Sequence, residues 1–254
     1  MLNYEEKGEG RAVVLLHGYL ENLRMWKSIG NELSKIYKVV KIDLPGHGKS
    51  KTYGKIHTME FMAEKVNAVL DELKIEDPIL IGHSMGGYVT LAFTELFPKK
   101  LKGFILLNST SLPDSEEKKE QRLKAVETAQ RNFDALVKMS IPNLFAEKKR
   151  EFLKEEMEFA KELARETPIE GVTAALLGMR ERPDRTNVLL SFKGAKGLVM
   201  GKYDQAVNPE ELKKIIPEES NILVTELEAA HMAHLEVPEH TLNFLFDFLS
   251  DVWE

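Results

Sequence analysis

The sequence has no cysteine among its 254 residues. This absence excludes disulfide bonds, cysteine-ligated metal sites and a cysteine nucleophile, and it fits the reducing cytoplasm. No apolar run approaches the roughly 18 residues that a membrane-spanning helix needs. The first ten residues are polar and acidic, whereas a secretory signal starts basic and then becomes apolar. We therefore expect a cytoplasmic protein that does not associate with membranes.

A basic excess is also missing, because the formal net charge is −6. Proteins whose main partner is nucleic acid usually concentrate positive charge on one face, so we expect no nucleic acid as the main partner. Hydrophobic residues make up 43% of the chain and charged residues 30%, a balance that permits a sizeable core. The length fits one large domain, or one domain that carries an insertion. The sequence leaves the oligomeric state open.

Short aliphatic runs of strand length recur along the chain without clear polar alternation. This pattern is typical of strands that are buried on both faces of a parallel sheet. The runs span residues 12–16, 38–42, 78–81, 103–107, 197–200 and 221–224. Between them lie stretches with apolar residues three and four positions apart, at 61–73, 89–97 and from 238 onward. The alternation predicts an α/β fold with a doubly wound, mostly parallel sheet.

Residues 113–185 interrupt this alternation. They contain no strand-like run, and apolar residues at helical spacing stand among dense, mixed charges. Prolines within the stretch divide it into several helices. Charge runs alone usually form a solvated surface, but these apolar residues need a surface that buries them. We interpret residues 113–185 as a helical cap, inserted into a core formed by residues 1–112 and 186–254.

The motif that carries chemistry is Gly82-His83-Ser84-Met85-Gly86, which stands between a strand run and a helix pattern. In this context G-x-S-x-G forms a sharp turn that lifts the serine above the sheet. The glycines are needed because a Cβ would not fit beside the strained nucleophile. We predict that Ser84 is a nucleophile. The alternative is an ordinary strand-to-helix turn whose small residues only allow close packing.

Several motifs in fixed order resemble those of the α/β-hydrolase superfamily. They are His17-Gly18-Tyr19, residues 43–50, the turn at Ser84, residues 201–204 and residues 231–236. Among its members, the chain is similar to small bacterial carboxylesterases and related acyl hydrolases that carry a helical cap. The resemblance implies the α/β-hydrolase fold, with one short strand near residues 2–6 where the family usually has a hairpin.

A serine nucleophile needs a base and a group that orients the base. The family's chain order is serine, acid, histidine, and Asp204 and His231 supply the last two. We expect His231 to take the Ser84 proton, while Asp204 fixes its tautomer. Two alternatives stay open. Asp204 could cap the helix that begins near Pro209, and His234 competes as the base, although the family's pattern puts the catalytic histidine first in His-x-x-His-Leu-Glu.

The resemblance assigns the oxyanion hole to the backbone N–H groups of Tyr19 and Met85. Such donors typically stabilise a transition state by ~3 kcal/mol each. The Tyr19 ring could instead only wall the pocket. We expect His17 to be structural, with its ring bonded to loop backbone.

Other sites are disfavoured. Gly48-Lys49-Ser50 resembles the end of a phosphate-binding loop, but position 43 is aspartate where that loop needs glycine. The spacing of His231 and His234 is a weak metal signal without a third ligand, so we expect no metal and no cofactor. The haloalkane and epoxide hydrolases of this fold use an aspartate nucleophile, which a serine at position 84 argues against.

The expected function is hydrolysis of a small carboxylic ester or related acyl substrate through an acyl-enzyme. A non-catalytic ligand-binding protein on the same scaffold is the alternative, because a fold does not fix a function. Thioesterases, carbon–carbon bond hydrolases, perhydrolases and lyases can use the same residues. The sequence does not separate these chemistries.

Overall fold

The computed structural model describes residues 1–253 and contains a seven-stranded sheet. The strands are β1 (Tyr4–Lys7), β2 (Ala12–Leu16), β3 (Lys38–Ile42), β4 (Ile79–His83), β5 (Gly103–Leu107), β6 (Ala195–Gly201) and β7 (Ile222–Leu227). Their order in the sheet is β1-β3-β2-β4-β5-β6-β7, and only β1 runs antiparallel to its neighbour. The predicted doubly wound, mostly parallel sheet is therefore confirmed, including a single short N-terminal strand.

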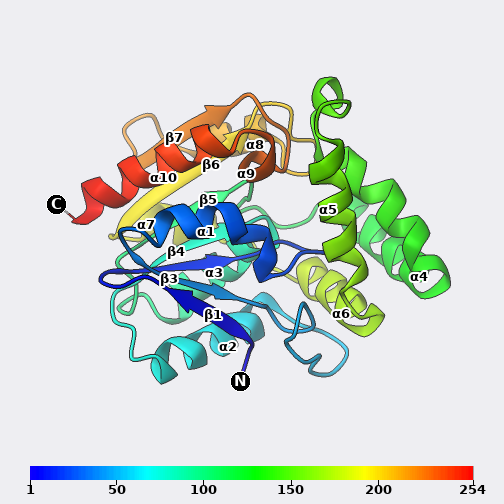
Figure 1. Ribbon diagram of the computed structural model, residues 1–254, viewed down its shortest axis with the longest axis horizontal. Coiled ribbons are helices and arrows are strands. Elements are labelled where there is room, and N and C mark those ends of the chain that lie inside the picture. Colours follow the sequence, from blue (N-terminus) through cyan, green and yellow to red (C-terminus); the bar gives the residue numbers. More distant parts are fainter. Residues whose placement is uncertain (254) are drawn as a thin grey trace.

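Helices cover both faces of the sheet (Figure 1). The α-helices are α1 (Lys27–Leu33), α2 (Met59–Glu72), α3 (Met85–Leu96), α4 (Glu116–Ser140), α5 (Lys154–Arg165), α6 (Ile169–Arg180), α7 (Thr186–Ser191), α8 (Pro209–Ile215), α9 (Ala233–Glu236) and α10 (Pro238–Trp253). Short 3₁₀ helices span Leu23–Trp26, Ile141–Leu144 and Glu147–Lys149. None of the helices within residues 1–253 has the length and apolar character needed to cross a membrane.

Strand β2 shows why the strand sequences do not alternate between polar and apolar residues. Val13 and Leu15 pack into the core on the side of α1 and α10, whereas Val14 and Leu16 pack into the core on the side of α2 and α3. Successive side chains of a strand point to opposite faces, so burial on both faces requires apolar residues throughout.

Strand β7 differs from the prediction. The aliphatic run at 221–224 indicated burial on both faces, but Leu223 and Val224 are 43% and 40% exposed. The cause is position, because β7 is the last strand of the sheet and pairs only with β6.

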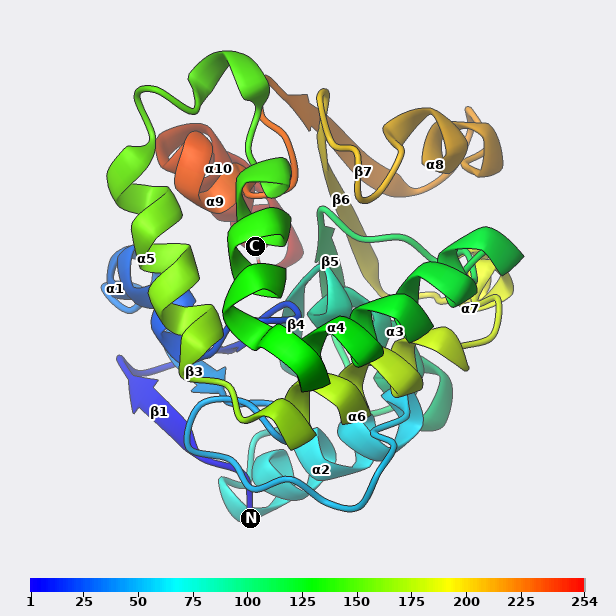
Figure 2. The same cartoon turned by 90° about the vertical axis from the view of Figure 1, so that its right-hand side faces the viewer.

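Residues 113–185, hereafter the inserted segment, contain α4, α5, α6 and two of the 3₁₀ helices, and they contain no strand. Figures 1 and 2 show the three helices together on the side toward which the parallel strands point. Helix α4 is interrupted at Asn132, whose φ of −157° and ψ of 85° are not helical. Phe145 is buried in the core, but Phe152 is 84% exposed. The expectation that the segment buries such apolar residues is therefore wrong for Phe152.

Candidate active site

Ser84 occupies a strained turn between strand β4 and helix α3. Strand β4 ends at His83, α3 begins at Met85, and Ser84 has φ 50° and ψ −114°. A positive φ is uncommon for a residue with a Cβ, and surrounding structure must hold it in place. Two hydrogen bonds of the Ser84 backbone do so. Its N–H donates to the Leu107 carbonyl at 3.0 Å, and its carbonyl accepts from the Ser109 hydroxyl at 2.7 Å.

Glycines on either side of Ser84 are required by close backbone contacts. A Cβ on Gly82 would lie 2.4 Å from the carbonyl oxygen of Gly86. A Cβ on Gly86 would lie 2.2 Å from the carbonyl oxygen of Leu16, at the end of β2. The small residues of the motif thus let α3 begin directly against the neighbouring strand, which fixes the position of the serine.

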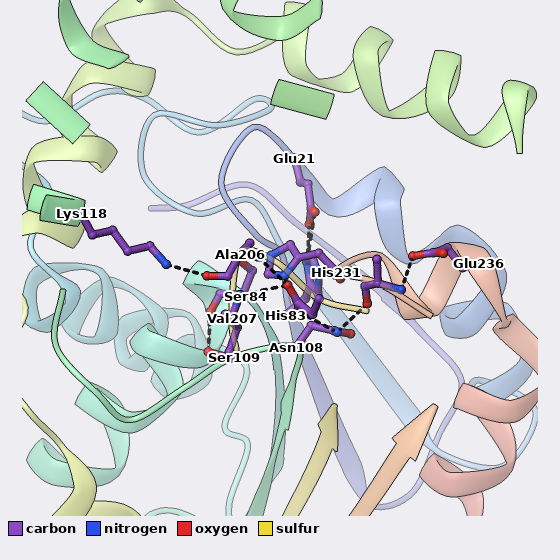
Figure 3. A network of polar contacts seen from close by, with 12 residues as sticks. Glu21, His83, Ser84, Asn108, Ser109, Lys118, Ala206, Val207, His231 and Glu236 are labelled. Atoms are coloured by element: carbon purple, nitrogen blue, oxygen red, sulfur yellow. Dashed lines mark hydrogen bonds and ion pairs between the residues drawn. The ribbon is translucent and has the colours of Figure 1, made fainter. Parts of the chain in front are cut away.

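Ser84, His231 and Asp204 form a hydrogen-bonded chain. The Ser84 Oγ lies 2.8 Å from His231 Nε2, and His231 Nδ1 lies 2.8 Å from Asp204 Oδ2. A carboxylate only accepts hydrogen bonds, so Nδ1 carries the proton and Nε2 accepts from the serine hydroxyl. The three residues follow β4, β7 and β6, which are parallel strands of one sheet, so their carboxyl ends lie at the same edge. Figure 3 shows Ser84 and His231 side by side there. The structure brings together all three side chains that the sequence singled out.

Asp204 is held as an anion. Its Oδ1 accepts hydrogen bonds from the N–H groups of Ala206 at 2.8 Å and Val207 at 2.9 Å. Its Oδ2 also accepts from Asn108 Nδ2 at 3.1 Å. Burial alone would raise the pKa of Asp204, but the His231 charge and these hydrogen bonds outweigh burial and lower it. Asp204 therefore stays ionised at neutral pH, as a partner of an imidazolium must.

The geometry disfavours both alternative assignments. Helix α8 is capped by Asn208, which accepts from the Glu210 N–H at 2.9 Å, and not by Asp204. His234 is buried, its ring packs 5.4 Å from that of Trp26, and neither ring nitrogen has a hydrogen-bond partner within residues 1–253. Burial lowers the pKa of His234 well below its usual value. His234 is thus a neutral ring of the core.

The two expected oxyanion donors are Met85, directly after Ser84 in the chain, and Tyr19, which lines the cavity together with Ser84. Met85 is the first residue of α3, and Tyr19 lies in the turn that follows β2. The His17 ring fixes that turn: its Nε2 accepts from the Leu44 N–H at 2.9 Å, and its Nδ1 lies 2.8 Å from the Gly18 carbonyl oxygen. His17 is therefore structural, as the sequence indicated.

A buried ion pair that sequence reasoning missed lies under the site. His83 Nδ1 is 3.0 Å from Glu21 Oε1, and His83 Nε2 donates to the His231 carbonyl at 2.9 Å (Figure 3). Both neighbours are acceptors, so both ring nitrogens donate and the His83 ring is positively charged. Glu21 Oε2 also accepts from the Gly18 N–H at 2.6 Å. The pair thus links the loop of Gly18 and Tyr19 to the backbone of His231.

Charge holds this pair in its ionised form. Burial alone would raise the pKa of Glu21, but the His83 charge and the hydrogen bonds from His83 and Gly18 lower it to about 2. Burial alone would lower the pKa of His83, and the Glu21 charge outweighs burial and raises it. Glu21, His83 and His234 could offer three metal ligands within 4.8 Å of one another. A metal there would replace the Glu21–His83 pair, so we describe the cluster as an ion pair.

Two further residues position the loops of the site. Asn108, just after β5, donates to the Ala230 carbonyl at 2.9 Å besides its bond to Asp204. Glu236 accepts from the Ala230 N–H at 2.8 Å and from the Ala146 N–H of the inserted segment at 3.1 Å. Glu236 had a sequence signal, as the last residue of His-x-x-His-Leu-Glu. Asn108 had only its place at the end of a strand that lies beside β4.

A cavity of about 130 Å³ opens over the serine. Core and inserted segment both line it, with Tyr19, Glu21, Ser84, Tyr88, Lys118, Arg122, Leu144, Met179, Ala206, Val207 and His231. Larger surface hollows lie elsewhere, such as that between α2 and the loop before β4, whose lining residues include no serine or histidine. The cavity over Ser84 is therefore the candidate substrate pocket.

Comparisons with known proteins agree with the fold. A family model described as the alpha/beta hydrolase fold matches residues 11–238. A thermophilic esterase from Thermogutta terrifontis, solved with malate bound, is 32% identical, with a TM-score of 0.92 over 99% of this chain and 93% of that one. The enol-lactonase of Burkholderia xenovorans LB400 shares the fold at 24% identity, with a TM-score of 0.91 over 98% of this chain and 96% of that one.

Curated relatives are longer than this chain. The dihydrolipoyllysine-residue acetyltransferase component of the acetoin cleaving system of Pseudomonas putida is 30% identical over 97% of this chain, which spans 65% of that protein. A protein named putative esterase/lipase from Haemophilus influenzae is 33% identical over 40% of this chain and 35% of its own length. The chain belongs to the alpha/beta hydrolase fold family.

Proposed function

We propose that the protein is a serine hydrolase that cleaves a small carboxylic ester or related acyl compound through an acyl-enzyme. The observation that carries the proposal is the continuous hydrogen-bonded chain from Asp204 through His231 to Ser84, with 2.8 Å at both links. It has the chemical order that acyl transfer requires, with acid, base and nucleophile in reach of one another. The likeness to the Thermogutta terrifontis esterase along nearly the full chain supports the same class of reaction.

In the proposed first step, His231 Nε2 takes the Ser84 proton while Oγ attacks the substrate carbonyl carbon. The carbonyl oxygen becomes negative, and the N–H groups of Tyr19 and Met85 donate hydrogen bonds to it. His231 then gives its proton to the leaving alcohol, and the ester bond breaks. Water, deprotonated by the same histidine, then attacks the acyl carbonyl carbon. The bond to Ser84 Oγ breaks, the acid leaves, and His231 returns the proton to Oγ. Asp204 stabilises the imidazolium in both halves.

The inserted segment is proposed to act as a cap that roofs the site. Its residues Leu144 and Met179 line the cavity over Ser84 together with core residues. A roof of this kind excludes water and shapes the acyl or alcohol pocket. The small cavity favours a short acyl chain.

Covalent labelling tests the proposed nucleophile directly. A fluorophosphonate should label the protein at one site per chain, and Ser84→Ala should remove both the label and ester hydrolysis. If the Ser84→Ala variant kept more than about a hundredth of wild-type kcat, Ser84 would not be the nucleophile, because triad serines contribute far more. A protein that binds esters but neither reacts nor turns over would favour the non-catalytic alternative.

A substrate screen separates the remaining chemistries. We expect p-nitrophenyl esters of short acids to be cleaved with a higher kcat/KM than acyl-thioesters and vinylogous diketones. If a thioester or a diketone were the preferred substrate, the proposed catalytic residues would stand, but the assigned substrate class would change from ester to that compound.

A further inference from the structure

Two positively charged side chains of helix α4 line the cavity over Ser84. Lys118 and Arg122 stand four residues apart, so they lie on the same face of the helix. Lys118 Nζ donates to the Ala206 carbonyl at 2.5 Å, beside the loop that carries Asp204 (Figure 3). Within residues 1–253 no carboxylate forms an ion pair with Lys118.

Arg122 is only partly neutralised. Its side chain is 12% exposed, and its Nε and Nη2 donate to the Asp114 carboxylate. Asp114 also accepts a hydrogen bond from Nη1 of buried Arg182 at 2.6 Å, so one negative charge is shared by two guanidinium groups. The third nitrogen of Arg122, Nη1, lies 3.5 Å from the Met179 sulfur, which is a weak acceptor. The Asp114 cluster thus retains about one positive charge.

The other charged groups of the pocket do not cancel this excess. Glu21 lines the cavity, but its charge is matched by His83 beneath it. The hydroxyl of Tyr19 is buried near Arg122 and has no hydrogen-bond partner within residues 1–253. The net charge of the whole chain is −6, so this local excess is opposite in sign to the protein as a whole.

We propose that Arg122, with Lys118 and the Tyr19 hydroxyl, binds a carboxylate of the substrate. The enzyme would then prefer esters whose acyl or alcohol part carries a second, ionised carboxyl group. A buried excess cation is unfavourable until an anion pairs with it, and a guanidinium edge fits a carboxylate. The inference rests on the proposed function, because it gives the substrate class of the same site.

Matched ester pairs test the preference. On the acyl side, mono-4-nitrophenyl glutarate is compared with 4-nitrophenyl pentanoate. On the alcohol side, 3-carboxyphenyl acetate is compared with phenyl acetate. We expect kcat/KM for the charged member to exceed that for the neutral member by about tenfold or more in at least one pair, as expected for a charge-assisted hydrogen bond. Preference for the neutral member in both pairs would overturn the proposal.

Variants distinguish direct binding of the substrate carboxylate by Arg122 from a general effect of positive charge on helix α4. Arg122→Met should remove most of the preference, measured as the ratio of kcat/KM values, and Arg122→Lys should keep part of it. Asp114 retains Arg182 in both variants, which favours a folded protein. Lys124→Gln is the control, because exposed Lys124 lies two residues along α4 and on another face. A ratio that fell equally in Lys124→Gln and Arg122→Met would contradict direct binding.

Binding measured without turnover keeps the inference separate from the proposed reaction. In calorimetry, glutarate should bind wild-type protein more tightly than pentane-1,5-diol, and Arg122→Met should weaken glutarate binding by about tenfold. Loss of fluorophosphonate labelling with intact glutarate binding would defeat the serine-hydrolase proposal only. Labelling of Ser84 without selective glutarate binding or a charged-ester preference would defeat the carboxylate assignment only.

Discussion

Glu21→Gln tests the buried ion pair with His83. Glutamine keeps the shape of the side chain and one acceptor oxygen but removes the negative charge. The Glu21 pKa is lowered from 4.5 to about 2. This lowering of the Glu21 pKa corresponds to about 3 kcal/mol of folding free energy at neutral pH. The same free energy is not counted again for His83, because both shifts report one interaction. At pH 6 we therefore expect the free energy of unfolding of the variant to be about 3 kcal/mol lower than that of the wild type.

The pH dependence gives the sharper signature. A carboxyl group whose pKa is lower in the folded than in the unfolded state stabilises the folded protein at any pH above its unfolded-state pKa. This contribution is lost as the pH falls to the folded-state pKa. For Glu21 the loss runs from about pH 5 to pH 2. Between pH 6 and pH 3.5 the wild type should therefore lose about 1.4 kcal/mol more than Glu21→Gln. Because the pKa of His83 is raised, its own contribution is lost in the opposite direction, as pH rises through the folded-state value.

Guanidinium unfolding followed by circular dichroism at pH 6 and pH 3.5 measures both quantities. Glu76→Gln is a suitable control, because exposed Glu76 also carries one carboxyl and precedes β4. The reasoning would be refuted if wild type and Glu21→Gln lost stability in parallel between the two pH values. The variant should also lower kcat, since Glu21 holds the Gly18 N–H beside the proposed oxyanion donor.

Three further outcomes follow from the site. His231→Ala should reduce turnover by ~10⁴-fold or more, whereas His234→Ala should mainly reduce stability; equal kinetic losses would contradict the assignment of the base. Gly86→Ala should cost at least ~1–3 kcal/mol in thermal or guanidinium unfolding, because its Cβ would meet a backbone oxygen at 2.2 Å. Met179→Ala should raise kcat/KM for long acyl esters relative to short ones, while the exposed Met139→Ala should leave this profile unchanged.

The parts of the fold and site that the sequence predicted depend on local constraints. The strand at 103–107 is apolar because neighbours cover it, and that requirement is written in its own residues. Gly82 and Gly86 mark the turn because a Cβ cannot fit there, so the motif reports a backbone shape. The prediction of Asp204 and His231 rests on the chain order of the family that the sequence resembles and on their places after strands.

The residues that escaped sequence reasoning act through partners remote in the chain. Glu21 is an ordinary acidic loop residue until the sheet order brings it to His83, 62 positions later. Arg122 belongs to a charged helix, and the pairing with Asp114 and Arg182 that leaves it an excess charge exists only after folding. The exposure of Leu223 likewise depends on which strand ends the sheet.

The inserted segment is anchored to the loops that carry the proposed acid and base. Leu144 accepts a hydrogen bond from the His231 N–H at 2.9 Å, and Lys118 donates to the loop after Asp204. Glu236 accepts from Ala146 of the segment and from the residue before His231 through one carboxylate. A rigid swing of the whole segment would break these bonds and disturb the histidine. Substrate access in this protein should therefore depend on side chains around the cavity more than on opening of the segment as a lid.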